Sequence, residues 1–456
     1  MITNTKISPA FEPFLADSGE DGKRDAIVIY QAPPIEGLHL RGRLREIKRR
    51  LDEVKEQASI QKTLEVEQKV LTQYREASRE LGYTEQPLKT STIGSGTLPV
   101  ATVEVTRRTL EALADQPDVV AILPNQKIHL IQPQRVEYAA LVQQEQQDSL
   151  TWGLKQLEIP KLWESTRGQD INVAVLDTGV YGAHSALNDR VKEFIVIDPL
   201  GRRINAAPAF DCGQHGTHVC GTIAGGQDSN GVMIGVAPQA NLFVAGVLIG
   251  DTTLRTLMEG ISWAIEQGAD IINMSLGLNY YEPLFAEVLE ILLNQYGILP
   301  VVAIGNENHG NSSSPGNTYN AFSVGAVEKT PADDVDVTFF SSGASLVFPG
   351  KEPNGLVIKP DVVAPGAQIY SCIPPTKRPN GAFEYNFMDG TSMATPHVAG
   401  VAALLMAAHP TAPVTDIIKV LKETASHPDG SDLRPCNRWG HGLIQPIEAL
   451  KALGSK

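Results

Sequence analysis

The stretch GTSMATPHVAG, residues 390–400, opens an apolar segment of Ala, Leu and Val that continues to residue 408. This composition predicts a buried helix over residues 395–408, with Ser392 on the turn before it. Backbone N–H groups at a helix start lack intrahelical partners and stabilise negative charge on a neighbouring oxygen. Pro396 is compatible with this position, because first-turn N–H groups have no intrahelical partner. Ser392 is therefore either a helix N-cap or a nucleophile, and the rest of the chain decides between them.

The length and composition are those of a globular protein with room for two domains. The chain has 456 residues, of which 42% are hydrophobic and 20% charged, as in ordinary folded proteins. Its formal net charge of -14 argues against a nucleic-acid partner, because phosphates require a basic face. No run of about 18 uncharged apolar residues occurs, so we expect no membrane span.

The N-terminus and the cysteines bear on the compartment. Residues 1–24 are polar and acidic and lack the apolar core of a secretory signal. The four cysteines have no CxxC spacing and predict no disulfide framework. We therefore expect a cytoplasmic protein, while leaving export open, with residues 1–23 as a disordered leader.

The first third of the chain predicts a small α+β domain over residues 24–133. Its order is strand, helix, strand, helix, strand, which is typical of a small two-layer sandwich. The charge run in its long helix is interpreted as a solvated face. A polar, Gln-rich linker follows over residues 134–150. The expected strands cover residues 26–32, 98–106 and 119–123, the last continuing over 127–131, and the expected helices lie within 40–81 and 106–114.

From residue 151 to residue 456 the pattern changes to apolar strands separated by helices. Strands that are apolar on both faces predict a mostly parallel sheet with helices on each side. Ligands of such sheets bind beyond the carboxyl ends of the strands. The expected strands are 171–176, 241–247, 271–274, 299–304 and 321–327, and the expected helices are 217–224, 253–267, 285–296, 395–408 and 414–424.

Polar residues occur where these elements meet. Asp177 follows one strand, Asn306 follows another, and His215 precedes a helix of small residues. Each alone has an ordinary explanation as a turn or packing residue. Together with Ser392 they form the set that nucleophilic acyl transfer requires, since a serine hydroxyl needs an imidazole to accept its proton and a carboxylate to orient that imidazole.

A zinc site is the competing interpretation of the segment around His215. His218, Cys212 and Cys220 lie nearby in the sequence. No second thiol pair and no carboxylate has a ligand-like spacing, so we expect no metal there. Cys220 is interpreted as a small buried residue.

The chain resembles the subtilisin-like serine proteases (subtilases), which carry the catalytic residues in the order Asp, His, Ser. The resemblance implies a subtilisin-like α/β fold, with a mostly parallel sheet flanked by helices, preceded by a small α+β (ferredoxin-like) prodomain. The catalytic domain would span residues 151–456, with WGHGLI at 439–444 as its closing segment. The matching motifs are VAVLDTGV, HGTHVCGTIAG, INMSLG, VVAIGNENHG, KPDVVAPG and GTSMATPHVAG.

The resemblance also implies a role for each catalytic position. Ser392 would be the nucleophile, with His215 as general base and then general acid. Asp177 would hold His215, and Asn306 and the Ser392 N–H would form the oxyanion hole. His218 is expected to be structural.

Substrate binding is implied for a second group of residues. Ser275, Leu276 and Gly277 would bind the substrate backbone as an added strand. Gly305 and the loop to residue 316 would line the pocket for the residue before the scissile bond.

The calcium site common in the family is incomplete in this chain. Ala186 stands where the family often has an aspartate ligand, although Asp228 and Asn230 remain in the loop 227–231. We expect no cofactor to be required, and calcium is the one candidate that the resemblance raises.

The function implied is serine endopeptidase activity through an acyl-enzyme, in a zymogen that cleaves itself between residues 132 and 150. The expected partners are a protein or peptide substrate and the chain's own N-terminal domain, as intramolecular chaperone and inhibitor. Nucleic acid and membrane are not expected as partners. The alternative is a catalytically silent subtilase-fold protein that binds or regulates.

Overall fold

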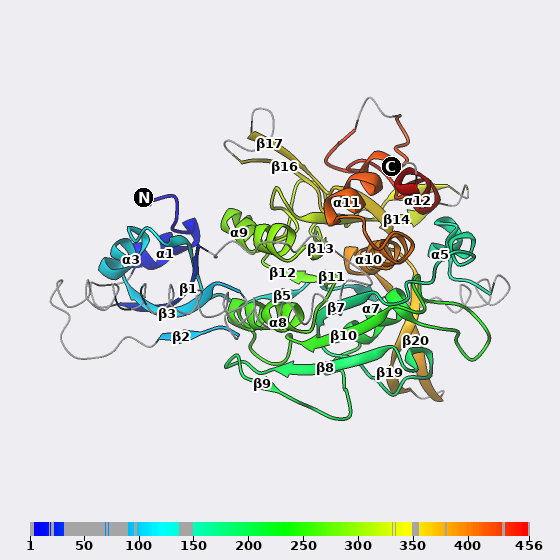
Figure 1. The fold of residues 1–456 in the computed structure, drawn as a ribbon, viewed down its shortest axis with the longest axis horizontal. Helices are drawn as coiled ribbons and strands as arrows, with labels where there is room; N and C mark the ends of the chain where they lie inside the picture. Colours follow the sequence, from blue (N-terminus) through cyan, green and yellow to red (C-terminus); the bar gives the residue numbers. More distant parts are fainter. Residues whose placement is uncertain are drawn as a thin grey trace.

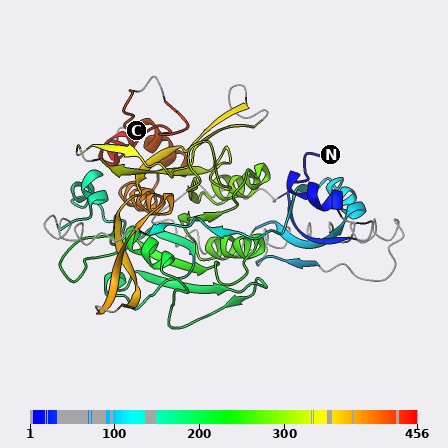
Figure 2. The same cartoon turned by 180° about the vertical axis from the view of Figure 1, so that it is seen from behind.

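The chain forms two domains joined side by side (Figure 1), and the same arrangement is seen from behind in Figure 2. The computed structural model describes residues 4–17, 19, 22–31, 69, 72, 90–94, 98–135, 149–330, 332, 334–348, 355–378, 381–430 and 434–454.

The N-terminal domain is a four-stranded antiparallel sheet in the order β2-β3-β1-β4. Successive side chains of a strand point to opposite faces, and β1 is apolar on both. Ala26 and Val28 pack with α3 and the N-terminal segment, whereas Ile27 and Ile29 pack against the larger domain. The elements are β1 (Lys23–Tyr30), β2 (Thr90–Thr92), β3 (Val100–Thr106), α3 (Arg107–Ala114) and β4 (Val119–Pro124).

The leader expected to be disordered is partly ordered, so that prediction is wrong for residues 4–17. They form η1 (Pro9–Phe11) and α1 (Glu12–Asp17), and Phe11 is fully buried. Ile7, Phe11 and Phe14 share one apolar cluster, and their spacing of four and three residues is the helical signal that was overlooked. The helix expected within 40–81 lies outside the described residues, apart from Lys69 and Thr72.

The larger domain is built on a nine-stranded sheet in the order β15-β14-β13-β11-β7-β10-β8-β9, with β18 also paired to β14. The pairs among the inner strands are parallel, and the edge strands β9 and β15 pair antiparallel. The strands are β7 (Asn172–Asp177), β8 (Val191–Ile197), β9 (Arg203–Ile204), β10 (Asn241–Gly246), β11 (Ile271–Met274), β13 (Leu299–Ala303), β14 (Phe322–Lys329), β15 (Val335–Val337) and β18 (Val362–Pro365).

Helices cover both faces of this sheet, as the continuous apolar strands predicted. In β7, Val173 and Val175 belong to one buried cluster, and Ala174 and Leu176 to the other. The first cluster includes α5 (Trp152–Gln156), α6 (Ile159–Leu162), α7 (His215–Ala224), α10 (Thr391–Ala408), α11 (Val414–Glu423) and α12 (Pro446–Gly454). The second includes α8 (Leu254–Glu266), η3 (Pro283–Phe285), α9 (Ala286–Glu290) and the π-helical turn η4 (Ile291–Gln295).

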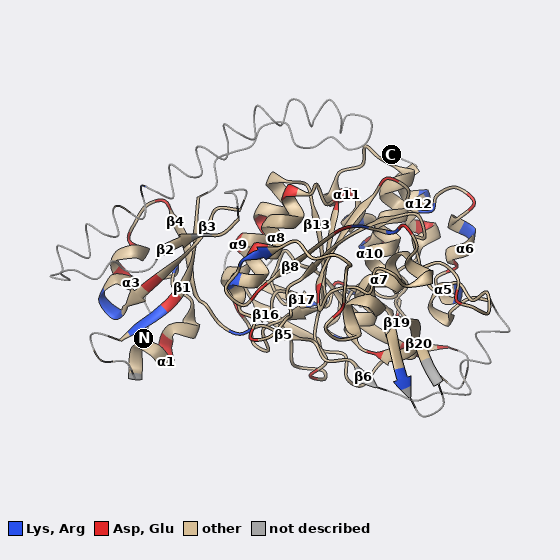
Figure 3. Cartoon of the chain, turned by 90° about the horizontal axis from the view of Figure 1, so that it is seen from below, with Lys and Arg blue, Asp and Glu red and all other residues tan. Residues whose placement is uncertain are grey.

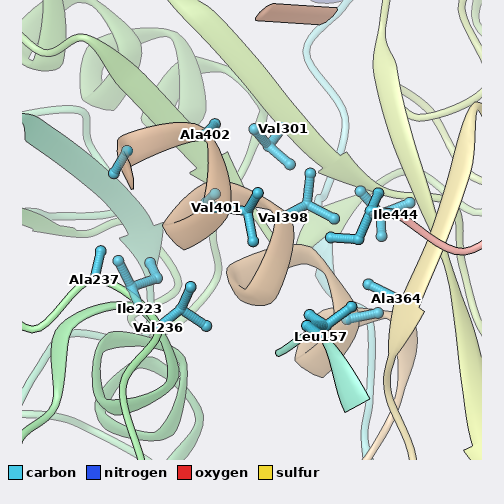
Figure 4. Close-up of a cluster of buried hydrophobic side chains, with 14 of the residues drawn as sticks. Leu157, Ile223, Val236, Ala237, Val301, Ala364, Val398, Val401, Ala402 and Ile444 are labelled. Atoms are coloured by element: carbon cyan, nitrogen blue, oxygen red, sulfur yellow. The ribbon is translucent and has the colours of Figure 1, made fainter. Parts of the chain in front are cut away.

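Helix α10 is the central helix of the domain. Figure 4 shows Val398, Val401 and Ala402 of this helix packed among side chains from several other elements. In Figure 3 charged residues mark outer helices and hairpins, and α10 carries none. Among the described residues, α10 alone is long and apolar enough to cross a membrane, but 89% of that span is buried inside the protein. It is therefore a core helix.

The start of α10 differs from the prediction. The helix begins at Thr391 rather than at residue 395, so Ser392 lies in its first turn and not before it. Pro396, which has no N–H, lies inside the helix. The Ser392 carbonyl, which an N–H at position 396 would otherwise bind, accepts a hydrogen bond from Ser275 Oγ at 3.2 Å.

Smaller elements complete the fold. Two of them, β5 and β6, come from the segment that links the domains and pair with strands of the larger domain. They are β5 (His129–Leu130), β6 (Gln134–Arg135), η2 (Ser185–Leu187), β12 (Leu276–Gly277), β16 (Ala344–Val347), β17 (Leu356–Lys359), β19 (Ile369–Arg378) and β20 (Gly381–Asp389).

Candidate active site

Asp177 and His215 form a buried hydrogen-bonded pair. Asp177 ends β7 and His215 begins α7, and they are 0% and 3% exposed. His215 Nδ1 lies 2.8 Å from Asp177 Oδ1 and 2.9 Å from Oδ2. Because the carboxylate only accepts, Nδ1 carries a proton and Nε2 of the neutral ring is left as an acceptor.

A second aspartate, Asp211, fixes the approach to His215. Its carboxylate accepts hydrogen bonds from the N–H and Oγ1 of Thr217 and from Thr178 Oγ1, at 2.6–2.8 Å. Thr178 follows Asp177 directly, so Asp211 ties the end of β7 to the first turn of α7. Gly216 is required there, because a Cβ would lie 2.0 Å from the Gly179 carbonyl oxygen. Asp211 was not predicted, because an aspartate in a loop is usually a turn residue.

Asn306 is oriented by Thr391, the residue before Ser392. Asn306 Oδ1 accepts hydrogen bonds from the N–H and Oγ1 of Thr391, both at 2.9 Å. With Oδ1 held in this way, Asn306 Nδ2 donates to the Gln132 carbonyl at 3.0 Å. Gly305 precedes it with φ of 119°, and a Cβ there would lie 2.4 Å from Glu307 Oε2. The orienting role of Thr391 was not predicted.

Ser392 is fully buried, and its hydroxyl is engaged by the segment that links the two domains. Ser392 Oγ donates to the Ile131 carbonyl at 3.0 Å and lies 3.5 Å from the Ser275 carbonyl. His215 Nε2 is buried and has no hydrogen-bond partner. The structure thus joins Asp177 to His215, and Asn306 to Thr391, but records no hydrogen bond between Ser392 and His215 in this state.

Ser275, Leu276 and Gly277 bind a strand, and that strand belongs to the chain itself. In β12, Leu276 lies opposite Leu130 and Gly277 opposite His129, in an antiparallel pair. The Ser275 carbonyl accepts the N–H of Ile131 at 3.3 Å.

The expectation that residues 127–131 extend the N-terminal sheet is therefore wrong. The chain leaves that sheet after β4, where Asn125 Oδ1 accepts the N–H of Arg255 in the first turn of α8 at 3.1 Å. Periodicity predicted a strand in the correct place but carries no information on its partner.

Two further buried histidines, His218 and His397, each lie within hydrogen-bond distance of a main-chain carbonyl. Burial lowers the pKa of His218 to about 3, and its Nε2 lies 3.0 Å from the Ile369 carbonyl. Burial also lowers the pKa of His397 to about 4, and its Nδ1 lies 2.8 Å from the Met393 carbonyl. Both rings are therefore neutral near pH 7.

Comparison with known proteins assigns the fold and the chemistry to one family. The subtilase family profile matches residues 168–442. The M-protease of Shouchella clausii (strain KSM-K16) is 32% identical over 362 residues, which are 78% of this chain and 80% of that protein. Subtilisin E of Bacillus subtilis (strain 168) is 34% identical over 303 residues, 65% of this chain and 70% of that protein. The chain belongs to the subtilase family. Like the subtilisins, it is a serine endopeptidase.

A solved structure supports the same fold. Fervidolysin from Fervidobacterium pennivorans, described as a keratinolytic enzyme related to subtilisin, superposes with a TM-score of 0.67 at 24% sequence identity. The match covers 95% of this subtilase and 62% of the fervidolysin chain. The subtilisin-like α/β fold with a mostly parallel sheet is thereby confirmed.

The residues of this subtilase do not form the calcium site that its family suggests. Asp228 Oδ1 accepts the N–H groups of Asn230 and Val232 at 2.7 and 2.9 Å, and Oδ2 accepts the Tyr370 hydroxyl at 3.0 Å. Both carboxylate oxygens therefore already bind protein donors. At Ala186 no carboxylate is available.

The zinc interpretation also fails on the residues present. In the part of the chain that the structure describes, no group of three or more His, Cys, Asp or Glu side chains is placed to hold a metal ion. All four cysteines are free, with Cys212 exposed. Burial raises the pKa of Cys220, and raises that of Cys372 to about 12, so both are neutral thiols.

Proposed function

We propose that this subtilase hydrolyses peptide bonds through an acyl-enzyme formed on Ser392. Once His215 Nε2 accepts the Ser392 proton, Oγ attacks the carbonyl carbon, and the imidazolium is stabilised by Asp177. Asn306 Nδ2 and the Ser392 N–H stabilise the oxyanion. His215 then donates its proton to the leaving nitrogen, and water hydrolyses the ester by the same steps.

A single observation carries this proposal. Residues 126–135, called the crossing segment below, lie along the catalytic residues as an extended peptide, with main-chain hydrogen bonds to Ser275 and β12. The carbonyl of Gln132 meets Asn306 Nδ2, and that of Ile131 meets Ser392 Oγ. A peptide substrate bound by strand addition brings its carbonyl to the same groups.

We further propose that the N-terminal domain acts as intramolecular chaperone and inhibitor in a zymogen. Its sheet shares an apolar cluster with α8 and α9. At the edge of this contact Glu259 Oε2 accepts the N–H of Gly94 at 2.7 Å, and the Ser8 hydroxyl donates to Glu282. Self-cleavage between residues 132 and 150 would separate the two domains.

The test compares wild-type protein with Ser392→Ala after expression, by intact mass and by hydrolysis of an unstructured protein substrate. We expect wild type to hydrolyse the substrate and to lose its N-terminal domain, and Ser392→Ala to do neither. Hydrolysis that persists in Ser392→Ala would refute the catalytic proposal. A wild-type protein that hydrolyses substrate but remains full length would refute self-processing alone.

We propose that the protein requires no metal, and in particular that it requires no calcium at the loop 227–231. Because both oxygens of Asp228 already accept hydrogen bonds from protein donors and Ala186 offers no carboxylate, we expect a chelator to remove nothing that the fold needs. The prediction is that the thermal midpoint and the hydrolysis rate are the same in excess EDTA and in millimolar calcium. A midpoint that falls in EDTA and recovers with calcium would contradict it.

The cytoplasmic location stays a prediction. An exposed thiol at Cys212 and three further free cysteines fit a reducing compartment. Fractionation of the producing cells with an antibody to the protein tests it.

A further inference from the structure

The crossing segment is bound on both sides of Ser392. On the N-terminal side of the residues that contact Ser392, the segment pairs with β12 through Leu130 opposite Leu276 and His129 opposite Gly277. The Ile128 N–H also donates to the Thr252 carbonyl at 3.3 Å. On the C-terminal side, Gln134 and Arg135 in β6 pair antiparallel with Asp389 and Met388 in β20. The segment therefore cannot slide without breaking pairs at both ends.

The register divides the catalytic groups between two consecutive carbonyls. Acyl transfer requires one carbonyl to meet the hydroxyl at its carbon and the oxyanion donors at its oxygen. Here the Ser392 hydroxyl donates to the Ile131 oxygen, whereas Asn306 Nδ2 donates to the Gln132 oxygen, each at 3.0 Å. Neither peptide bond has both groups in place.

The bond between Ile131 and Gln132 is held in an unreactive way. Its carbonyl oxygen accepts a hydrogen bond from the Ser392 hydroxyl, whose proton must point at His215 for attack, and His215 Nε2 is left without a partner. The Ile131 N–H is anchored to the Ser275 carbonyl, and Ile131 is only 3% exposed. Attack on this bond therefore requires the segment to move.

The next bond has its carbonyl at Asn306, but its leaving nitrogen belongs to Pro133. The Pro133 Cα lies 3.6 Å from the place of a Cβ on Gly390, so the ring sits beside the turn that precedes Ser392. A proline nitrogen carries Cδ in place of hydrogen. For this nitrogen to take the proton of His215, its lone pair must turn towards the imidazole and Cδ must swing away from it, a movement that the closed ring and the β6 pairing oppose.

We propose, on the basis of the catalytic roles above, that the crossing segment is a substrate-like inhibitor protected from cleavage in place by its register and by Pro133. Both bonds around Gln132 stay intact in the wild-type protein. Self-processing then falls after residue 135, and the segment leaves with the N-terminal domain, as part of the inhibitor.

Replacement of Pro133 by alanine removes the barrier at the leaving nitrogen, so that the bond after Gln132 is cleaved whenever movement of the segment brings its carbonyl carbon to Ser392 Oγ. Ser392 Oγ bonds to the Gln132 carbonyl carbon while His215 takes the hydroxyl proton. The bond to the nitrogen of residue 133 breaks and that nitrogen receives the proton. Water then cleaves the ester, which restores Ser392 and leaves a carboxylate on Gln132.

The experiment follows full-length Pro133→Ala, wild type, Gln132→Ala and Pro133→Ala/Ser392→Ala by intact mass and N-terminal sequencing. We expect Pro133→Ala to be cut next to Gln132 on the order of 100-fold faster than wild type, the range that a misplaced reacting group costs. Gln132→Ala, which keeps the proline, stays uncut at these bonds. The double variant stays uncut, because Ser392→Ala removes the nucleophile that makes the cut.

A fluorophosphonate probe on the same proteins, applied after the N-terminal domain has been released by an added protease, separates the two ways of failing. If Ser392 is labelled but Pro133→Ala remains whole, or if wild type is cut beside Gln132, the protection by Pro133 is refuted while the catalytic function stands. If Ser392 is labelled in none of them, the proposed catalytic function fails, and this inference with it.

Discussion

At the scale of residues, the catalytic side chains depend on neighbouring side chains that fix their orientation. Thr391 fixes Asn306 through two hydrogen bonds, and Asp211 fixes the turn that presents His215. Asp177, His215, Asn306 and Ser392 were predicted because each follows a strand or opens a helix. Thr391 and Asp211 were not, because a threonine beside a serine and an aspartate in a loop have no pattern of their own. The Ser392 hydroxyl also donates its hydrogen bond to the carbonyl of Ile131, a residue distant in sequence.

We predict that Thr391→Val lowers kcat while KM changes little. The variant keeps the N–H to Asn306 but loses the hydroxyl, and one hydrogen bond is worth about 1 kcal/mol, or about fivefold in rate. The measurement is steady-state hydrolysis of a chromogenic peptide by the processed protein.

Thr395→Val is the matched control for Thr391→Val. It removes a buried hydroxyl from the same helix, one that donates to the Thr391 carbonyl and not to Asn306. Equal losses in the two variants would contradict the orienting role of Thr391.

At the scale of elements, five inner strands and the helices α7, α8, α10 and α11 were predicted, whereas β8, β18 and the hairpins were not. β7, β10, β11, β13 and β14 are apolar on both faces, so their composition predicts burial between helices. The β19–β20 and β16–β17 hairpins depend on pairing between strands that periodicity does not specify. The predicted start of α10 was too late because residues 391–395 are polar or small apart from Met393, although all are buried.

We predict that Gly400→Ala destabilises the protein by about 1–3 kcal/mol, the usual cost of overpacking. A Cβ at Gly400 in α10 would lie 2.6 Å from Val236 Cβ, in the cluster seen in Figure 4. Urea unfolding of the Ser392→Ala protein, which does not cleave itself, measures the change.

The control is Ala408→Ser at the half-buried end of the same helix, which should change the free energy of unfolding by less than about 0.5 kcal/mol. A Gly400→Ala protein as stable as its parent would show that α10 and the Val236 segment move apart without cost.

At the scale of the whole molecule, the N-terminal domain covers a carboxyl group of the larger one. Glu282 is 1% exposed, accepts hydrogen bonds from Ser8 and from the N–H of Leu284, and lies near Tyr280 and Tyr281. β1 is apolar on both faces, and both are buried. The sequence did not reveal what covers the second face, because that depends on the fit between two separately folded surfaces.

We predict that the domains associate less tightly as pH rises. Burial raises the pKa of Glu282 in the joined state, against the two hydrogen bonds that lower it. The contribution of Glu282 to association is thus complete below the ordinary carboxyl pKa and is lost as pH rises through the raised value.

The measurement is urea unfolding of Ser392→Ala with and without Glu282→Gln from pH 4 to pH 8. The neutral amide does not titrate, so the protein with Glu282 should lose stability relative to the amide variant as pH rises. A difference between the two that stays constant with pH would contradict the prediction.

The central claim is that Asp177 and His215 make Ser392 a nucleophile, and its most direct measurement is the rate of Ser392 modification by a fluorophosphonate. The wild-type, Asp177→Asn and His215→Ala proteins are compared over hours after the N-terminal domain has been released from each, by an added protease where self-processing is lost, with the modified residue located by peptide mass mapping. We predict modification of Ser392 alone in wild type, and a rate lower by on the order of 10³-fold or more in each variant. Modification at another residue, or an equal rate in His215→Ala, would contradict the account.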